Sequence, residues 1–123
     1  MIPSYLTLRV LVRGETLYLA EGAVHDTGVS VRWSQSIGLC DDIGEMSDTV
    51  SGLADSGGVY FIPGFHGLQA PVQDPTATAG FVGVTHATGK EQMLRAVLEA
   101  IAFSMKHLVD VFISESSYRC LSF

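Results

Sequence analysis

The sequence has 123 residues, 47% of them hydrophobic, and a formal net charge of -6. This length suits one domain at most, and a mean hydropathy of +0.32 is high for a free-standing domain. A segment taken from the core of a larger protein would show a similar excess of hydrophobic residues. The seven Lys and Arg are scattered, which argues against a nucleic-acid partner because such binding depends on clustered positive charge. No apolar run approaches the roughly 20 residues that a membrane span needs.

Cysteine and histidine usage argues against a disulfide framework and against a zinc site. The two cysteines, Cys40 and Cys120, are too few and too far apart for either. The histidines are dispersed and lack partners at metal-ligand spacing, so we interpret them as surface or packing residues: His25, His66, His86 and His107. The sequence therefore predicts a reduced cytosolic protein without a metal site in this chain.

Alternation of apolar and polar residues at the start of the chain predicts a β-hairpin. Residues 6–13 alternate with period two, and residues 16–20 return as a second strand. Gly14 and Glu15 are the predicted two-residue turn.

A helix is predicted within residues 21–39, with Asp26 or Thr27 as its cap. Gly28 near its start leaves the backbone open to close approach by a ligand. A tight junction between a strand and a helix would use the same glycine, and the residues alone leave both readings open.

The middle of the chain is acidic and then rich in proline. Residues 41–56 predict a short surface helix with a solvated acidic face, and residues 59–62 predict a short buried strand. Residues 63–79 contain three of the four prolines and predict an ordered loop at a site or seam. His66 and Asp74 are polar residues of this loop. The sequence places no base or nucleophile beside either, so neither receives a catalytic role.

Residues 79–115 predict a strand, a polar turn and a long amphipathic helix. Thr88 and Glu91 match a capping box, in which a hydroxyl and a carboxylate satisfy free amides at a helix start. Arg95 and Glu99 predict an ion pair across one helical turn. The apolar stripe expected to be buried consists of Leu94, Leu98, Ile101, Met105, Leu108 and Phe112, widened by Val97 and Ala102.

The same stretch resembles the C-terminal signature of the FGGY family of carbohydrate kinases. The matching residues are Ala79, Phe81, Gly83, Val84, Gln92, Met93, Ala96, Val97, Leu98 and Glu99. Residues 57–63 and 67–71 resemble glycerol kinases, and residues 20–22, 26–28 and Trp33 resemble the atypical animal branch of these enzymes more than the bacterial one.

This resemblance implies an α/β fragment of the actin-like, ribonuclease-H-like ATPase fold, from the second lobe of a kinase. It implies a partial C-terminal domain over residues 1–115 and an unstructured or aberrant tail over residues 116–123. It also implies that Gly28 and Arg32 border a bound nucleotide, although bacterial relatives carry a glutamine in place of Arg32.

The family activity implied is phosphoryl transfer from ATP with Mg²⁺ to a small polyol such as glycerol. The phosphate loops and the central aspartate base of the family are not found in this sequence, so we expect the chain to be inactive alone. We expect nucleotide and polyol to be partners of the complete enzyme, with no nucleic acid and no membrane span.

Two alternatives remain open at this point. One is a non-catalytic pseudo-kinase fragment that binds only a nucleotide or a partner. The other, more remote, is a homodimeric aspartic protease, because Asp26-Thr27-Gly28 matches the triplet in which two aspartates share a proton. That alternative requires a chain rich in strands.

Overall fold

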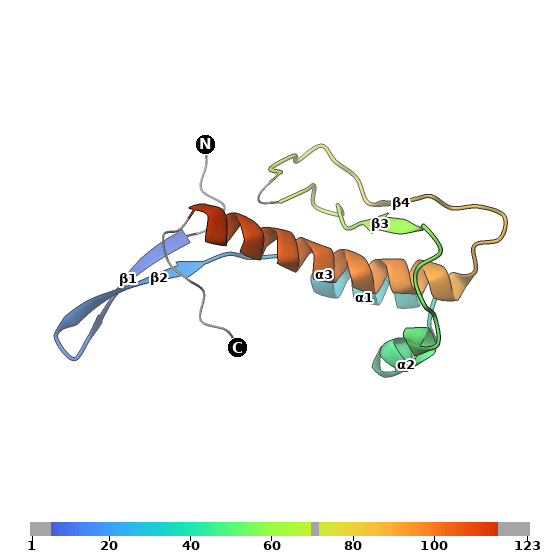
Figure 1. The fold of residues 1–123 in the computed structure, drawn as a ribbon, viewed down its shortest axis with the longest axis horizontal. Coiled ribbons are helices and arrows are strands. Elements are labelled where there is room, and N and C mark those ends of the chain that lie inside the picture. Colours follow the sequence, from blue (N-terminus) through green and yellow to red (C-terminus); the bar gives the residue numbers. More distant parts are fainter. Residues whose placement is uncertain (1–5, 70–71, 116–123) are drawn as a thin grey trace.

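The computed structural model describes residues 6–69 and 72–115, and its elements are arranged along one long helix, α3 (Figure 1). The predicted tail at residues 116–123 lies outside the described residues. In chain order the elements are β1 (Leu6–Val12), β2 (Glu15–Glu21), α1 (Thr27–Ser36), η1 (Ile43–Glu45), α2 (Met46–Ser51), β3 (Tyr60–Ile62), β4 (Gly80–Val82) and α3 (Lys90–Glu115).

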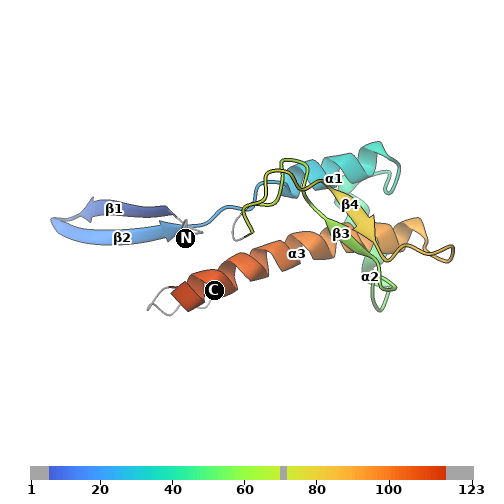
Figure 2. The ribbon, with the colours of Figure 1, turned by 90° about the horizontal axis from the view of Figure 1, so that it is seen from above.

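The predicted hairpin is present and extends away from the helices (Figures 1 and 2). Its turn is one residue earlier than predicted, at Arg13 and Gly14, which have φ values of 50° and 87°. Two positive φ angles match the strand twist in a two-residue hairpin turn, and glycine adopts them without steric cost. At the other end of the hairpin, Gly22 lies against the side chain of Leu108 in α3.

The strands β3 and β4 form a second antiparallel pair, with Phe61 opposite Phe81. Both strands were predicted, but their pairing across the proline-rich loop was not. Gly83 follows β4 with a φ of 82°, and a Cβ atom there would stand 2.2 Å from the carbonyl oxygen of Gly58. The glycine of the family signature therefore allows two backbone segments to approach each other.

The core lies against the first half of α3, where the side chains of Leu94 and Val97 are both 0% exposed. One buried cluster joins α3 to the segment around α2, and its members are Leu39, Cys40, Met46, Val50 and Leu94. A second cluster joins α3 to β3, and its members are Val59, Phe61, Ala96, Val97 and Ala100. Trp33 of α1 stacks on Phe61 with ring centroids 5.6 Å apart, so α1 packs against the same cluster.

The predicted apolar stripe of α3 is buried in its first half only. Met105 is 55% exposed, and Ala102 is exposed as well, so the described residues do not cover these two positions of the stripe. Phe103, Val109 and Ile113 are also exposed by 45% or more. The pattern of the helix is correct, but the two buried clusters extend along it only to Ala100.

The start of α3 differs from the predicted capping box. The hydroxyl of Thr88 accepts a hydrogen bond from the Thr85 backbone N–H at 2.9 Å and so closes the preceding turn. The side-chain oxygen of Gln92 accepts from the Gly89 N–H, which is the role predicted for Glu91. The helix begins at Lys90, so the third helical position is Gln92. A glutamine there fulfils the capping function equally well.

The acidic surface helix and the ion pair of α3 are confirmed. In α2 and the preceding η1, Met46 and Val50 are buried while Glu45 and Asp48 are exposed. Arg95 Nε donates to Glu99 Oε1 at 2.7 Å, and a second guanidinium nitrogen donates to the Leu53 carbonyl oxygen. Across residues 6–69 and 72–115, no helix combines the length and the apolar character that crossing a membrane requires.

Leu94→Ala is expected to cost about 2–5 kcal/mol of the free energy of unfolding, because it leaves a cavity in the cluster that joins α3 to the segment around α2. Met105→Ala, on the exposed part of the same helix, should change it by less than about 0.5 kcal/mol. Urea unfolding followed by circular dichroism measures both values in this chain. Equal losses for the two variants would contradict the burial described here.

Candidate functional site

The start of α1 and the loop between β3 and β4 meet at the carboxylate of Asp26. The Asp26 side chain is only 4% exposed, whereas the His66 side chain is 67% exposed. His66 Nδ1 lies 2.6 Å from Asp26 Oδ1, and the His66 backbone N–H donates to Asp26 Oδ2 at 3.1 Å. One carboxylate thus holds both the backbone and the ring of a residue 40 positions away in the sequence.

Asp26 occupies the predicted cap position of α1 but does not use its side chain for capping. No side-chain cap hydrogen bond is formed at Asp26, and Thr27 opens the helix. The backbone carbonyl of Asp26 instead accepts hydrogen bonds from the N–H of Ser30 at 3.0 Å and from its hydroxyl at 2.6 Å. The carboxylate is therefore directed to the loop.

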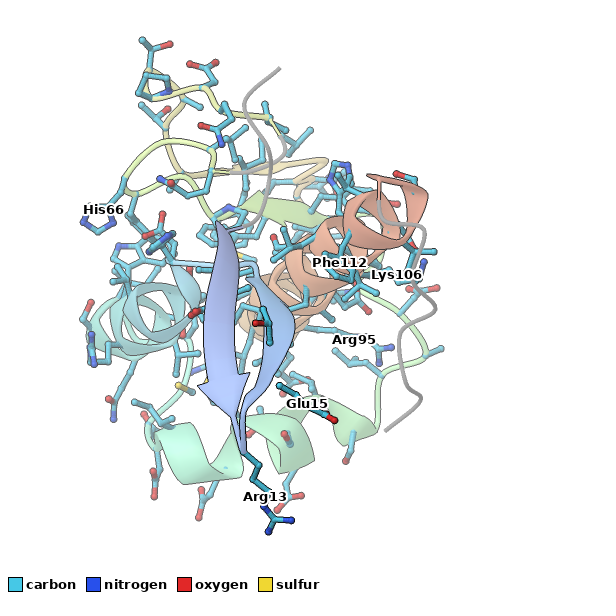
Figure 3. The ribbon with its side chains drawn as sticks, turned by 90° about the vertical axis from the view of Figure 1, so that its left-hand side faces the viewer. Arg13, Glu15, His66, Arg95, Lys106 and Phe112 are labelled. Carbon is cyan, nitrogen blue, oxygen red and sulfur yellow. The ribbon has the colours of Figure 1, made fainter. Side chains whose placement is uncertain are left out.

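The pKa of Asp26 lies below its usual value. Burial acts to raise this pKa, because a buried carboxylate loses the solvation of its charge, but the hydrogen bonds from the His66 ring and backbone N–H outweigh that effect. An ionised carboxylate only accepts hydrogen bonds, so the Nδ1 atom of His66 carries the proton in this pair. The ring then faces outward from the loop (Figure 3) with its Nε2 atom away from Asp26.

The loop that carries His66 is closed by Asp74. Leu68 and Asp74 exchange two backbone hydrogen bonds of 2.8 Å each. The Asp74 carboxylate accepts hydrogen bonds from the Thr76 hydroxyl and backbone N–H, which lower the pKa of Asp74. Asp74 therefore acts within the loop and holds its shape. Phe65, next to His66, packs edge-on against Trp33 of α1 at 5.3 Å.

Beneath the loop lies a hollow of about 100 Å³ between α1 and α3. Its wall comprises Ala23, Val24, His25, Asp26, Thr27, Pro63, Gly67, Leu68, Gln69, Val72, Ile101, Ser104 and His107. Small-molecule pockets usually enclose about 300–1,000 Å³. This hollow is therefore too small to enclose a nucleotide.

Gly28 and Arg32 lie one turn apart on an exposed face of α1. Apart from its two neighbours in the chain and the backbone of α1 itself, no described atom lies within 4 Å of the position that a Cβ atom would occupy at Gly28. The packing of the described residues therefore does not call for a glycine there, and the tight junction considered from the sequence is not observed.

His66 is a surface residue, as interpreted from the sequence, but the structure places the Asp26 carboxylate beside it, which the sequence analysis did not predict. No signal in the sequence joins the two residues, because they lie 40 positions apart in separate segments and no sequence motif contains both. The described residues contain no group of three or more histidine, cysteine or acidic side chains placed to hold an ion.

Comparison with protein families identifies the chain. The model of the C-terminal domain of the FGGY family of carbohydrate kinases matches residues 8–121. The chain belongs to this family. The family match includes the strand, turn and helix that carry the predicted signature, and it confirms the resemblance inferred from those residues.

Within the FGGY family, the chain is similar in sequence to glycerol kinases. The chain is 47% identical over 97 residues to mouse Glycerol kinase 5, covering 79% of this chain and 18% of that protein. It is 42% identical over 105 residues to zebrafish Glycerol kinase 5, covering 85% of this chain and 20% of the relative. The chain thus spans about a fifth of the length of these relatives.

The fold of the chain is also similar to that of a solved kinase structure. The crystal structure of Plasmodium falciparum glycerol kinase with ADP matches with a TM-score of 0.88 and 31% identity, covering 98% of this chain and 24% of that one. The architecture is that of an α/β fragment of the actin-like ATPase fold, as the sequence predicted.

Asp26→Asn is expected to destabilise the chain at neutral pH and to have a progressively smaller effect in acid. A carboxyl group with a lowered folded-state pKa stabilises the fold fully above its unfolded pKa, about 3.9, and this contribution is lost as the pH falls through the folded pKa. Urea unfolding of wild type and variant from pH 7 to acid measures the difference. Asp48→Asn, at an exposed acid of α2, is the control for loss of one charge. A difference that stays constant down to the lowest pH would contradict the role of the ionised carboxylate.

Proposed function

We propose that the chain is part of the second lobe of an ATP-dependent polyol kinase, most simply a glycerol kinase. The observation that carries this proposal is the likeness of nearly the whole chain to a glycerol kinase solved with ADP. The names of the curated relatives support glycerol as the polyol. A cytoplasmic location belongs to the same proposal, and the free, buried thiol of Cys40 is compatible with a reducing compartment.

Within this kinase, we assign the open face of α1 to the nucleotide. Outside α1 itself and its chain neighbours, no described atom lies within 4 Å of a Cβ position at Gly28, which leaves the backbone accessible to a ligand. Arg32, one turn further on, is exposed on the same face. Its planar guanidinium can stack on a purine or donate to phosphate oxygens.

The chemical step requires groups that the described residues do not provide. Phosphoryl transfer needs a base for the hydroxyl and a metal ion that bridges the phosphates. The part of the chain that the structure describes has no acidic cluster that fits a magnesium ion. In this proposal Mg²⁺, the base and the polyol contacts belong to other segments of a complete kinase.

A non-catalytic fragment that binds only a nucleotide or a partner is the second candidate, and the same lack of a base and a metal site favours it. The aspartic protease alternative has no support from the structure. It requires a chain rich in strands, whereas Asp26 precedes the helix α1 and α3 extends over 26 residues. The Asp26 carboxylate is also held by His66.

The chain alone is expected to show no glycerol phosphorylation, because the groups that stabilise the transition state are missing. Incubation with glycerol and MgATP, followed by an assay for glycerol 3-phosphate, is the measurement. The same assay without protein is the control. Turnover above that background would refute the proposal that this segment is not catalytic by itself.

Arg32→Glu in the full-length protein is expected to weaken ATP binding about tenfold, or about 1.4 kcal/mol, because it places a carboxylate beside a polyanion. Arg32→Gln should be milder, since its amide still donates hydrogen bonds. Titration with a fluorescent ATP analogue gives the affinities.

Arg13→Glu makes the same change of charge at the tip of the hairpin, which lies far from α1 (Figures 1 and 2). It controls for net charge. Equal ATP affinities for wild type and Arg32→Glu would remove Arg32 from the nucleotide site.

A further inference from the structure

We propose that Asp26 and His66 form a latch that fixes the β3–β4 loop to the start of α1 and thereby positions the nucleotide-bordering face of that helix. This inference rests on the assignment of Gly28 and Arg32 to the nucleotide. His66 is a positioning residue in this proposal, since it acts through α1 and the loop.

Burial of Asp26 is the first observation behind the latch. Asp26 is the one buried acidic or basic side chain among the residues whose burial the structure describes. Burial of a carboxylate is unfavourable unless its oxygens are hydrogen-bonded. Both of its oxygens receive hydrogen bonds from His66, one from the ring and one from the backbone N–H. The buried charge is therefore compensated only while the loop is in place.

The location of the helix contacts is the second observation. Adjacent loop residues, Phe65 and His66, contact α1 at Trp33 and at Asp26 respectively. In the sequence, these two contact points flank Gly28 and Arg32 on either side. A loop held at both points keeps the intervening helix segment in a single position. Release at Asp26 would remove one of these two contact points and keep the aromatic one.

The capping geometry is the third observation. A carboxylate at the start of a helix ordinarily accepts hydrogen bonds from the free amides of the first turn. The Asp26 carboxylate makes no such bond. Its hydrogen bonds hold a distant loop, and a purely local role for this side chain would not produce that arrangement.

A set of variants in the full-length protein tests the latch. His66→Ala removes the ring, and His66→Gln places its amide near the position of Nε2, where it cannot replace Nδ1. His66→Asn places an amide N–H near the position of Nδ1 and is the conservative variant. His66 is largely exposed, so these substitutions should not unfold the protein.

Two measurements report on the latch. Hydrogen exchange at the amide of residue 66 should become about tenfold faster or more in His66→Ala and His66→Gln, because the hydrogen bonds that tether the loop are weakened. ATP-analogue affinity should fall about fivefold in the same variants. His66→Asn should remain close to wild type in both. Asp26→Asn should reproduce the two defects.

Arg32→Glu separates failure of the latch from failure of the nucleotide site. If Arg32→Glu weakens binding while His66→Ala changes neither exchange nor affinity, the latch is refuted and the nucleotide site stands. If neither variant alters affinity, the positioning role is refuted together with the site. Equal effects of His66→Asn and His66→Ala would show that the ring acts by packing, and would also overturn the proposal.

Discussion

Burial of the first half of α3 holds the described structure together. Leu94 and Val97 are completely buried and belong to two different clusters, one shared with the segment around α2 and one shared with β3. Trp33 joins α1 to the second cluster through Phe61. The position of α1, and with it the candidate site, therefore depends on side chains of α3 that lie outside the site.

The elements could be predicted from the sequence because each has a local signal. Alternation marked the hairpin, and the spacing of apolar residues marked α3. The sequence analysis misplaced the hairpin turn and the start of α3 by one residue, because the conformation of a single residue decides each position. The hairpin turn lies at Arg13 and Gly14 because both adopt positive φ, a requirement that alternation does not reveal. Likewise, Gln92 rather than Glu91 completes the start of α3 because the helix begins one residue later than expected.

The candidate site likewise has a part that the sequence predicted and a part that depends on tertiary packing. Gly28 and Arg32 were found through a family resemblance, and helical spacing places them on one face. The contact between Asp26 and His66 could not be predicted, because it joins residues 40 positions apart and depends on the packing of the loop over α1. Burial along α3 shows the same dependence. Met105 has the correct spacing for a core residue but is exposed, because it lies beyond the two buried clusters, which extend along α3 only to Ala100.

The exposed second half of α3 has a consequence for the behaviour of the chain in solution. Phe103, Met105, Val109 and Ile113 present large apolar side chains along the last turns of a helix. Exposed large apolar side chains favour association when nothing covers them. Self-association of the isolated chain should therefore increase with its concentration, and the net charge of -6 opposes it through mutual repulsion. Added salt screens that repulsion, so ionic strength sets the balance between dispersed and associated chains.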